Sequence, residues 1–222
     1  MLPLRSEARA HRFPVATATL VLLCFAAFAV ELHLGARLPG LLERHALVPS
    51  RVLGPDPLGI GPFRLLAATA VSLFLHAGWL HLLGNMLFLW TFGGPVEGAL
   101  GPRRHLALFG LAGLAAAAAH LALNPRSGLP AIGASGAIAG LLASYLVLFP
   151  RARISGVSFL GLFAWWSRTP AWLYLPLWAL LQLASALLAK PGEGGIAWWA
   201  HLGGFVAGPP LLWILRPPRS RR

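Results

Sequence analysis

This sequence is short of cysteine and of acidic residues. Cys24 is its one cysteine, so an intrachain disulfide and a metal site made of cysteines are both excluded. Six Asp and Glu residues stand against 18 Lys and Arg, a formal net charge of +12. Because the basic residues gather at the ends of apolar segments, as membrane topology demands, we expect no nucleic-acid partner. None of the acidic residues lies near the middle of an apolar segment.

Apolar residues are abundant instead. Hydrophobic residues make up 57% of the chain and the mean hydropathy is +0.71, which indicates a membrane protein with several spans. Helices are expected, since lipid leaves strand backbones unpaired and the runs do not alternate as barrel strands do. Six segments are long enough to cross about 30 Å of hydrocarbon. They lie near residues 14–34, 77–96, 104–123, 135–149, 170–189 and 196–215.

We therefore predict an all-α membrane protein with one six-helix bundle. The bundle occupies residues 14–215, between an N-terminal tail (1–13) and a basic tail (216–222). Two further apolar stretches, 65–75 and 154–166, are too short to span and predict interfacial or re-entrant segments. The connection 35–75 is the longest, and we expect it to fold on or into the outer leaflet.

The basic residues also predict an orientation. With the N-terminus inside, twelve Lys and Arg lie on the inner side and six on the outer side, so the positive-inside rule places both termini in the cytoplasm. A composition rich in Ala and Arg and poor in Lys suggests a bacterial genome and hence the plasma membrane. One alternative stays open. Residues 5–12, an apolar stretch and Ala-Phe-Ala at 27–29 resemble a cleavable signal peptide, whose removal would leave the other spans in the same orientation.

Two polar residues, Ser135 and His201, stand inside apolar runs, where polar groups are costly and suggest function. Ser135 starts a 15-residue stretch that ends at Phe149, two residues before Arg151, and His201 starts one of equal length that ends at Leu215, just before Arg216. At 1.5 Å per residue, each lies about 22 Å above the inner face and about 8 Å below the outer one. The two side chains are thus predicted at nearly the same depth.

Asn85 and His81 fall close to the same layer. Asn85 is twelve positions before Glu97, which places it about 18 Å above the inner face. His81 is four residues earlier, on the same helix face and one turn nearer the outside. We expect these groups to share one pocket with Ser135 and His201.

Small residues can bring the helices together. Gly136 and Gly140 are four apart in one segment, and Gly204 and Gly208 are four apart in another. Small residues at this spacing let membrane helices approach closely. If these two glycine faces meet, the serine and the imidazole come within reach of each other.

The chemistry available to this pocket is that of a serine–histidine dyad. A serine needs a base to take its proton, and a neutral imidazole such as His201 is the usual one. A triad would add a carboxylate, which no apolar segment supplies. The Ser135 amide at a helix start, the Asn85 side chain and the His81 ring can each donate to an oxyanion.

The chain resembles the rhomboid family of six-span intramembrane serine proteases. The resemblance rests on residues 81–85 (HLLGN), 92–101 (FGGPVEGALG), 133–136 (GASG) and 201–208 (HLGGFVAG), which occur in the family's order. It implies that Ser135 is the nucleophile and His201 the general base. It further implies an oxyanion hole of Asn85, His81 and the Ser135 amide. Its implied substrates are transmembrane segments of other proteins, which enter sideways from the bilayer, with no cofactor.

Two positions depart from the family pattern. Ala139 stands where members often carry an aromatic residue that packs on the histidine, and Phe63 precedes Arg64 where Trp-Arg is usual. His201 is then held less rigidly, or by another aromatic residue.

Rival functions have weaker support. A catalytically silent rhomboid-like protein that binds or escorts membrane helices would lack the serine or the histidine. A small transporter would show repeats or broken helices, and the Pro209-Pro210 pair is the one candidate break. Zinc is not expected, because five-residue spacing would put His76 and His81 about 140° apart on a helix. The sequence does not indicate an oligomeric state.

Overall fold

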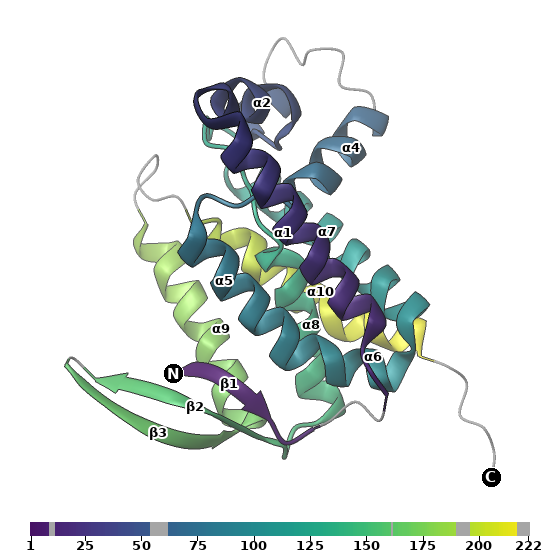
Figure 1. Ribbon diagram of the computed structural model, residues 1–222, viewed down its shortest axis with the longest axis vertical. Coiled ribbons are helices and arrows are strands. Elements are labelled where there is room, and N and C mark those ends of the chain that lie inside the picture. The colour runs from purple at the N-terminus through teal and green to yellow at the C-terminus, as the bar shows by residue number, and fades with distance from the viewer. Residues whose placement is uncertain (9–11, 54–61, 161, 190–195, 217–222) are drawn as a thin grey trace.

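The computed structural model describes residues 1–8, 12–53, 62–160, 162–189 and 196–216. It is a helical bundle with a small sheet at one end (Figure 1). The bundle helices are α1 (Val15–Leu34), α5 (Trp79–Phe88), α6 (Gly94–Leu100), α7 (Pro102–Leu123), α8 (Ser135–Leu148), α9 (Ala171–Leu188) and α10 (Trp198–Leu215). The sheet comprises β1 (Leu2–Ser6), β2 (Arg153–Leu160) and β3 (Phe163–Pro170).

A helix lies at each of the six apolar segments. Three helical stretches of the described chain are long and apolar enough to cross a membrane, namely Val15–His45, Pro102–Leu123 and Ala171–Leu188. Ser135–Leu148 is apolar but shorter. These helices are apolar on every side, as expected where one face meets other helices and the other meets lipid. The chain is an integral membrane protein.

The second apolar segment is one continuous run of helix with a change of pitch. α5 passes through a π-helical turn, η2 (Leu89–Gly93), directly into α6. Pro95 explains the change, because a proline has no N–H and its ring crowds the carbonyl four residues earlier. A π-helical turn accommodates such a conflict without ending the helix.

The first long connection contains short helices. They are η1 (Gly35–Arg37), α2 (Leu38–His45), α3 (Pro49–Val52) and α4 (Pro62–Ser72). The connection is held to the loop before α8, since the Ala131 N–H donates to the Leu47 carbonyl and the Gly133 N–H to the Ser72 carbonyl. α4 thus lies beside the start of α8.

The prediction of an all-α protein was wrong at one end of the bundle. The stretch 154–166, predicted as an interfacial or re-entrant segment, lies in two paired strands, and the tail 1–13 contains a third. β1 pairs with β2 and β2 with β3, both antiparallel. Arg168 of β3 forms a salt bridge of 2.6 Å with Glu7, just after β1. β2 and β3 are close in sequence and pair with each other, whereas β1 joins the sheet from the distant N-terminus.

The bundle therefore has two distinct ends. We call the end that carries the sheet the sheet end. The opposite end, where α8 begins at Ser135 and α10 at Trp198, is the serine end (Figure 1). α10 runs unbroken through Pro209 and Pro210, so the candidate break in this segment does not exist. Membrane helices tolerate proline because neighbouring groups satisfy the freed backbone.

Candidate active site

Ser135 and His201 meet at the serine end. Ser135 is the first residue of α8, and His201 lies in the first turn of α10. The Ser135 Oγ is 2.7 Å from Nε2 of His201, which is hydrogen-bond distance. The two side chains come from segments 66 residues apart, and the contact is partly buried.

Glycines allow this contact. A Cβ added to Gly204 would collide with the backbone oxygen of Gly136, and one added to Gly208 would collide with that of Gly140. A Cβ on Gly140 would in turn lie 3.1 Å from the Gly204 oxygen. α8 and α10 therefore touch backbone to backbone along the face that carries the serine and the histidine.

His201 has three further neighbours. Its Nδ1 lies 2.6 Å from the Oε1 of Gln182 on α9. The rings of Trp178 and Trp198 have their centroids 6.1 Å and 6.0 Å from that of the imidazole. Two aromatic residues other than one at position 139 therefore lie beside the histidine, one of the two possibilities left open by the sequence.

Gln182 was missed by reasoning from the sequence. The sequence did contain a sign of its importance. Gln182 is the single amide side chain of α9 and stands within an apolar run, where a polar group is costly. It lies outside every family-like motif, and residue counting along one helix does not show which neighbour a side chain faces. The contact with His201 becomes visible in three dimensions.

Asn85 and His81 lie next to the loop that leads into α8. A Cβ added to Gly133 would be 2.7 Å from Nε2 of His81 and 3.4 Å from Nδ2 of Asn85. The Ala77 N–H donates to Nδ1 of His81 over 3.3 Å, which leaves the ring proton on Nε2. The Asn85 Nδ2 is buried without a hydrogen-bond partner among the described residues. Two N–H donors thus converge beside Gly133.

Gly133 must be glycine for two reasons. Its φ is +115°, a conformation that residues with a side chain rarely adopt. A side chain would also fill the space in front of His81 and Asn85. The loop conformation keeps that space open.

His76 lies closer to His81 than the sequence analysis assumed. The two ring centroids are 5.2 Å apart. The estimate of 140° treated both residues as helical, but His76 precedes α5, which begins at Trp79. Its backbone N–H donates to the buried Glu31 carboxylate and its Nδ1 lies 3.0 Å from the Phe74 carbonyl oxygen, which fixes the loop before α5.

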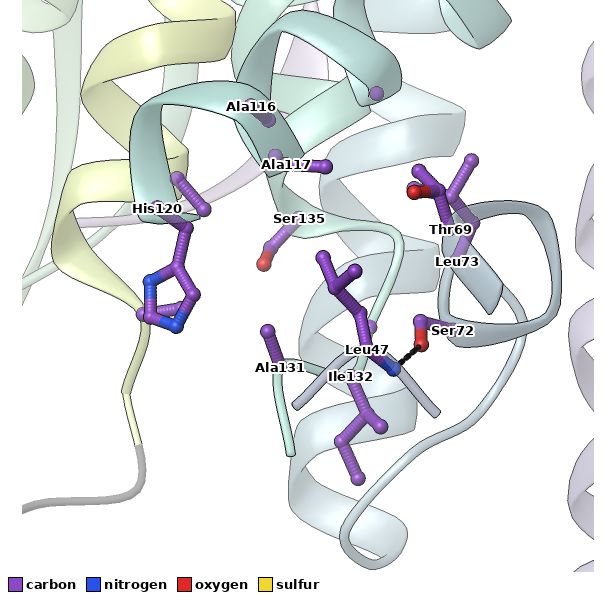
Figure 2. Close-up of a pocket in the computed structure, with 15 residues that line it drawn as sticks. Leu47, Thr69, Ser72, Leu73, Ala116, Ala117, His120, Ala131, Ile132 and Ser135 are labelled. Atoms are coloured by element: carbon purple, nitrogen blue, oxygen red, sulfur yellow. Dashed lines mark hydrogen bonds between the residues drawn. The ribbon is translucent and has the colours of Figure 1, made fainter. Parts of the chain in front are cut away.

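A small cavity of about 40 Å³ adjoins Ser135 (Figure 2). Polar groups reach it from α4, α7 and α8, and apolar side chains complete its wall. Its labelled lining residues are Leu47, Thr69, Ser72, Leu73, Ala116, Ala117, His120, Ala131, Ile132 and Ser135. This volume suffices for a water molecule, which needs roughly 10–15 Å³ by the same kind of measure.

Comparison with known proteins identifies the family. The model of the rhomboid domain matches residues 64–218, which hold Ser135, His201, Asn85 and His81. The chain belongs to the rhomboid family. The resemblance seen in the sequence is thereby confirmed.

Three similar rhomboid proteins carry mitochondrial or chloroplastic names. A presenilin-associated rhomboid-like protein, mitochondrial, of Bos taurus is 27% identical over 163 residues, which cover 67% of this chain and 40% of that protein. The mitochondrial rhomboid protein 1 of Saccharomyces cerevisiae is 30% identical over 148 residues, covering 65% of this chain and 40% of that protein. The chloroplastic rhomboid-like protein 11 of Arabidopsis thaliana is 29% identical, over 64% of this chain and 50% of that protein. The matched region spans half or less of each of these relatives.

Proposed function

We propose that this rhomboid is an intramembrane serine endopeptidase that cleaves transmembrane segments of other membrane proteins. The observation that carries the proposal is the 2.7 Å contact between Ser135 Oγ and His201 Nε2. A serine and an imidazole at this distance are the minimal pair for acyl transfer. Family membership supports the same assignment.

The proposed reaction has two halves. The Ser135 oxygen attacks the scissile carbonyl carbon while His201 takes the serine proton. This step gives a tetrahedral oxyanion and a protonated imidazole. Collapse breaks the C–N bond, and His201 passes the proton to the leaving amine. A water molecule then attacks the acyl-serine, giving its proton to His201, and the acid product leaves as the serine regains a proton.

The oxyanion hole is proposed to form beside Gly133. The Asn85 amide and the His81 Nε2–H both face this point. The backbone N–H of Ser135 belongs to the first turn of α8, where amides have no partner within the helix and the helix dipole favours negative charge. Fixed donors of this kind are worth about 100- to 1,000-fold in rate each.

We propose that six helices span the membrane and that both termini face the cytoplasm. β1 pairs with β2, which lies between α8 and α9, and this pairing supports placing the N-terminus and the α8–α9 connection on the same side of the membrane. Glu97, near the end of α6, accepts hydrogen bonds from Ala16 and Thr17 at the start of α1, which supports the same side for the α6–α7 turn. The basic residues favour the cytoplasm for this side. We propose the bacterial plasma membrane for this chain, although the relatives named above are mitochondrial or chloroplastic.

Substrates are proposed to be helices that unwind near the outer membrane surface. Ser135 lies about 8 Å below that surface by residue counting, so a cleavable bond must reach the same depth. α9 and the connection between α1 and α5 are the candidate boundaries that a substrate would pass.

Cleavage of a model transmembrane substrate by purified protein in detergent tests the proposal. Wild type is expected to cut, and Ser135→Ala and His201→Ala to lose activity. Ser144→Ala is the matched control, because this buried serine of α8 contacts the Gly208 carbonyl and not His201. Cleavage by Ser135→Ala at the wild-type rate overturns the mechanism. Substrate binding without cleavage by the wild type indicates instead a silent rhomboid-like protein.

A further inference from the structure

α9 turns two side chains toward His201. Gln182 is buried, and its Oε1 lies 2.6 Å from Nδ1 of the imidazole. Trp178, four residues earlier and so on the same face of the helix, lies beside the same ring and beside Phe205, one turn further along α10. The imidazole thus touches Ser135 with one nitrogen and α9 with the other.

The contact with Gln182 determines where the imidazole carries its proton. An amide oxygen accepts a hydrogen bond, so Nδ1 is the protonated nitrogen and Nε2 keeps its lone pair. That lone pair points to the Ser135 Oγ. This is the tautomer that can accept the serine proton.

We infer that Gln182 is a positioning residue that holds His201 in this tautomer and orientation. The inference rests on the proposed serine protease function and extends it from a dyad to three connected side chains. Gln182 takes the place that a carboxylate holds in a triad. In this chain an amide does so without bringing a charge into the membrane, where a carboxylate is costly.

An amide performs this task differently from a carboxylate. It is neutral, so it stabilises the protonated imidazole less than a carboxylate does. Its NH₂ group can also turn toward Nδ1, which would move the ring proton to Nε2 and block proton transfer from Ser135. A carboxylate at position 182 removes that second orientation.

The position of α9 therefore matters for the chemistry. Gln182 belongs to α9, whereas Ser135 and His201 belong to α8 and α10. A shift of α9 by about 1 Å away from α10 would lengthen the contact beyond hydrogen-bond range. The orientation of His201 thus depends on a helix that holds neither member of the dyad.

Kinetics of Gln182→Leu and Gln182→Glu in the full-length protein test the inference. Gln182→Leu removes the acceptor and is expected to lower kcat by about 10- to 100-fold, the range for losing a hydrogen bond to a group that becomes charged, with KM nearly unchanged. Gln182→Glu is expected to recover kcat. It should also move the acidic limb of the pH–rate profile to higher pH, because the carboxylate stabilises the protonated imidazole. Leu181→Ala, on a 57% exposed neighbour, is the matched control and should match the wild type.

The outcomes separate positioning from a structural role. Wild-type kcat and pH profile in Gln182→Leu overturn the inference. Equal losses in Gln182→Leu and Gln182→Glu, with a lowered unfolding midpoint in both, also overturn it, since they indicate a packing role.

A second readout does not depend on cleavage. Nitrogen-15 NMR of labelled histidine, with the His201 signals identified by their absence from His201→Gln, reports the protonated nitrogen directly. The inference expects the proton on Nδ1 in the wild type and a mixture in Gln182→Leu. A proton on Nε2 in the wild type overturns it. If the wild type cleaves no substrate but its proton is on Nδ1, the proposed function fails while the positioning contact stands.

Discussion

Two buried polar side chains at opposite ends of the bundle differ in their hydrogen bonding. At the sheet end, the Glu97 carboxylate accepts hydrogen bonds from the Ala16 N–H, the Thr17 N–H and the Thr17 hydroxyl over 2.7–2.9 Å. At the serine end, the Asn85 amide nitrogen is equally buried and has no partner among the described residues. Glu97 and Asn85 are 5% and 7% exposed, so burial does not explain the difference.

The buried atoms without a hydrogen-bond partner among the described residues differ between the two ends. A buried donor without a partner lowers the free energy of unfolding by about 1–3 kcal/mol, so its presence in a folded protein needs an explanation. His105 Nδ1, at the sheet end, is also without a partner in the described chain. The Thr17 hydroxyl donates to Glu97, so His105 must donate through Nε2 to Thr17, which leaves Nδ1 as a bare acceptor.

An unfilled acceptor occurs at both ends, His105 Nδ1 at the sheet end and His76 Nε2 beside His81 at the serine end. Among the described residues, the buried donor without a partner is the Asn85 amide at the serine end, which lies beside Gly133.

Removing the donor at Asn85 should produce the largest effect. Asn85→Ala is expected to lower kcat by about 100- to 1,000-fold, the range for one oxyanion donor. Its free energy of unfolding should change by less than about 1 kcal/mol, because no hydrogen bond of its nitrogen is lost on substitution. Cleavage assays and thermal unfolding in detergent measure the two quantities. Activity within threefold of the wild type would contradict the role of this amide.

A side chain at Gly204 should affect stability and activity together. The Cβ of Gly204→Ala would meet the Gly136 carbonyl oxygen and push α10 away from α8. Overpacking of this kind costs about 1–3 kcal/mol, and it also separates Ser135 from His201. Gly110→Ala is the control, since a Cβ at Gly110 meets nothing within 4 Å. Equal behaviour of the two variants would show that the glycine contact is dispensable.

Changing the acceptor at Glu97 should affect stability alone. Glu97→Gln places an NH₂ group against one of the donors at the start of α1 and is expected to cost about 1–3 kcal/mol. Cleavage per folded molecule should stay at the wild-type level, because Glu97 lies at the sheet end. Glu43→Gln, whose side chain is 69% exposed, should leave the unfolding midpoint unchanged. A loss of kcat in Glu97→Gln without a loss of stability would contradict a purely structural role for Glu97.

Removing the Tyr145 hydroxyl should give the smallest effect. Tyr145 on α8 shares a hydrogen bond with Ser6 of β1, which attaches the sheet to the bundle. Tyr145→Phe is expected to cost about 1 kcal/mol and to leave kcat unchanged. Ser6→Ala should cost more than Tyr145→Phe, because the Ser6 hydroxyl also bonds to the N–H and the carbonyl of Ala8. The double variant should be no worse than Ser6→Ala alone by the measured unfolding free energy. Additive losses would mean that the two hydroxyls act separately.

Hydropathy and residue counting predicted much of this structure. The six apolar segments all contain helices, because lipid leaves the backbone few alternatives. Ser135 and His201 were predicted at equal depth from segment lengths, and they lie in contact. The four glycines of α8 and α10 meet as their spacing suggested.

The parts that were missed depend on contacts between distant segments. β1 is a strand because β2 offers it a partner about 150 residues away, which no local pattern of the N-terminus shows. Gln182 matters because α9 happens to face α10 at His201. Trp178 and Trp198 likewise lie beside His201, and Trp178 does so through the packing of α9 against α10.

The proposed activation of Ser135 by His201 can be tested without a substrate. The purified protein is labelled with a fluorophosphonate, and mass spectrometry of its peptides locates the label. We expect an adduct on the Ser135 oxygen in the wild type and its loss in His201→Ala, with the protein still folded. An adduct on another residue, or undiminished labelling of Ser135 without His201, would contradict it.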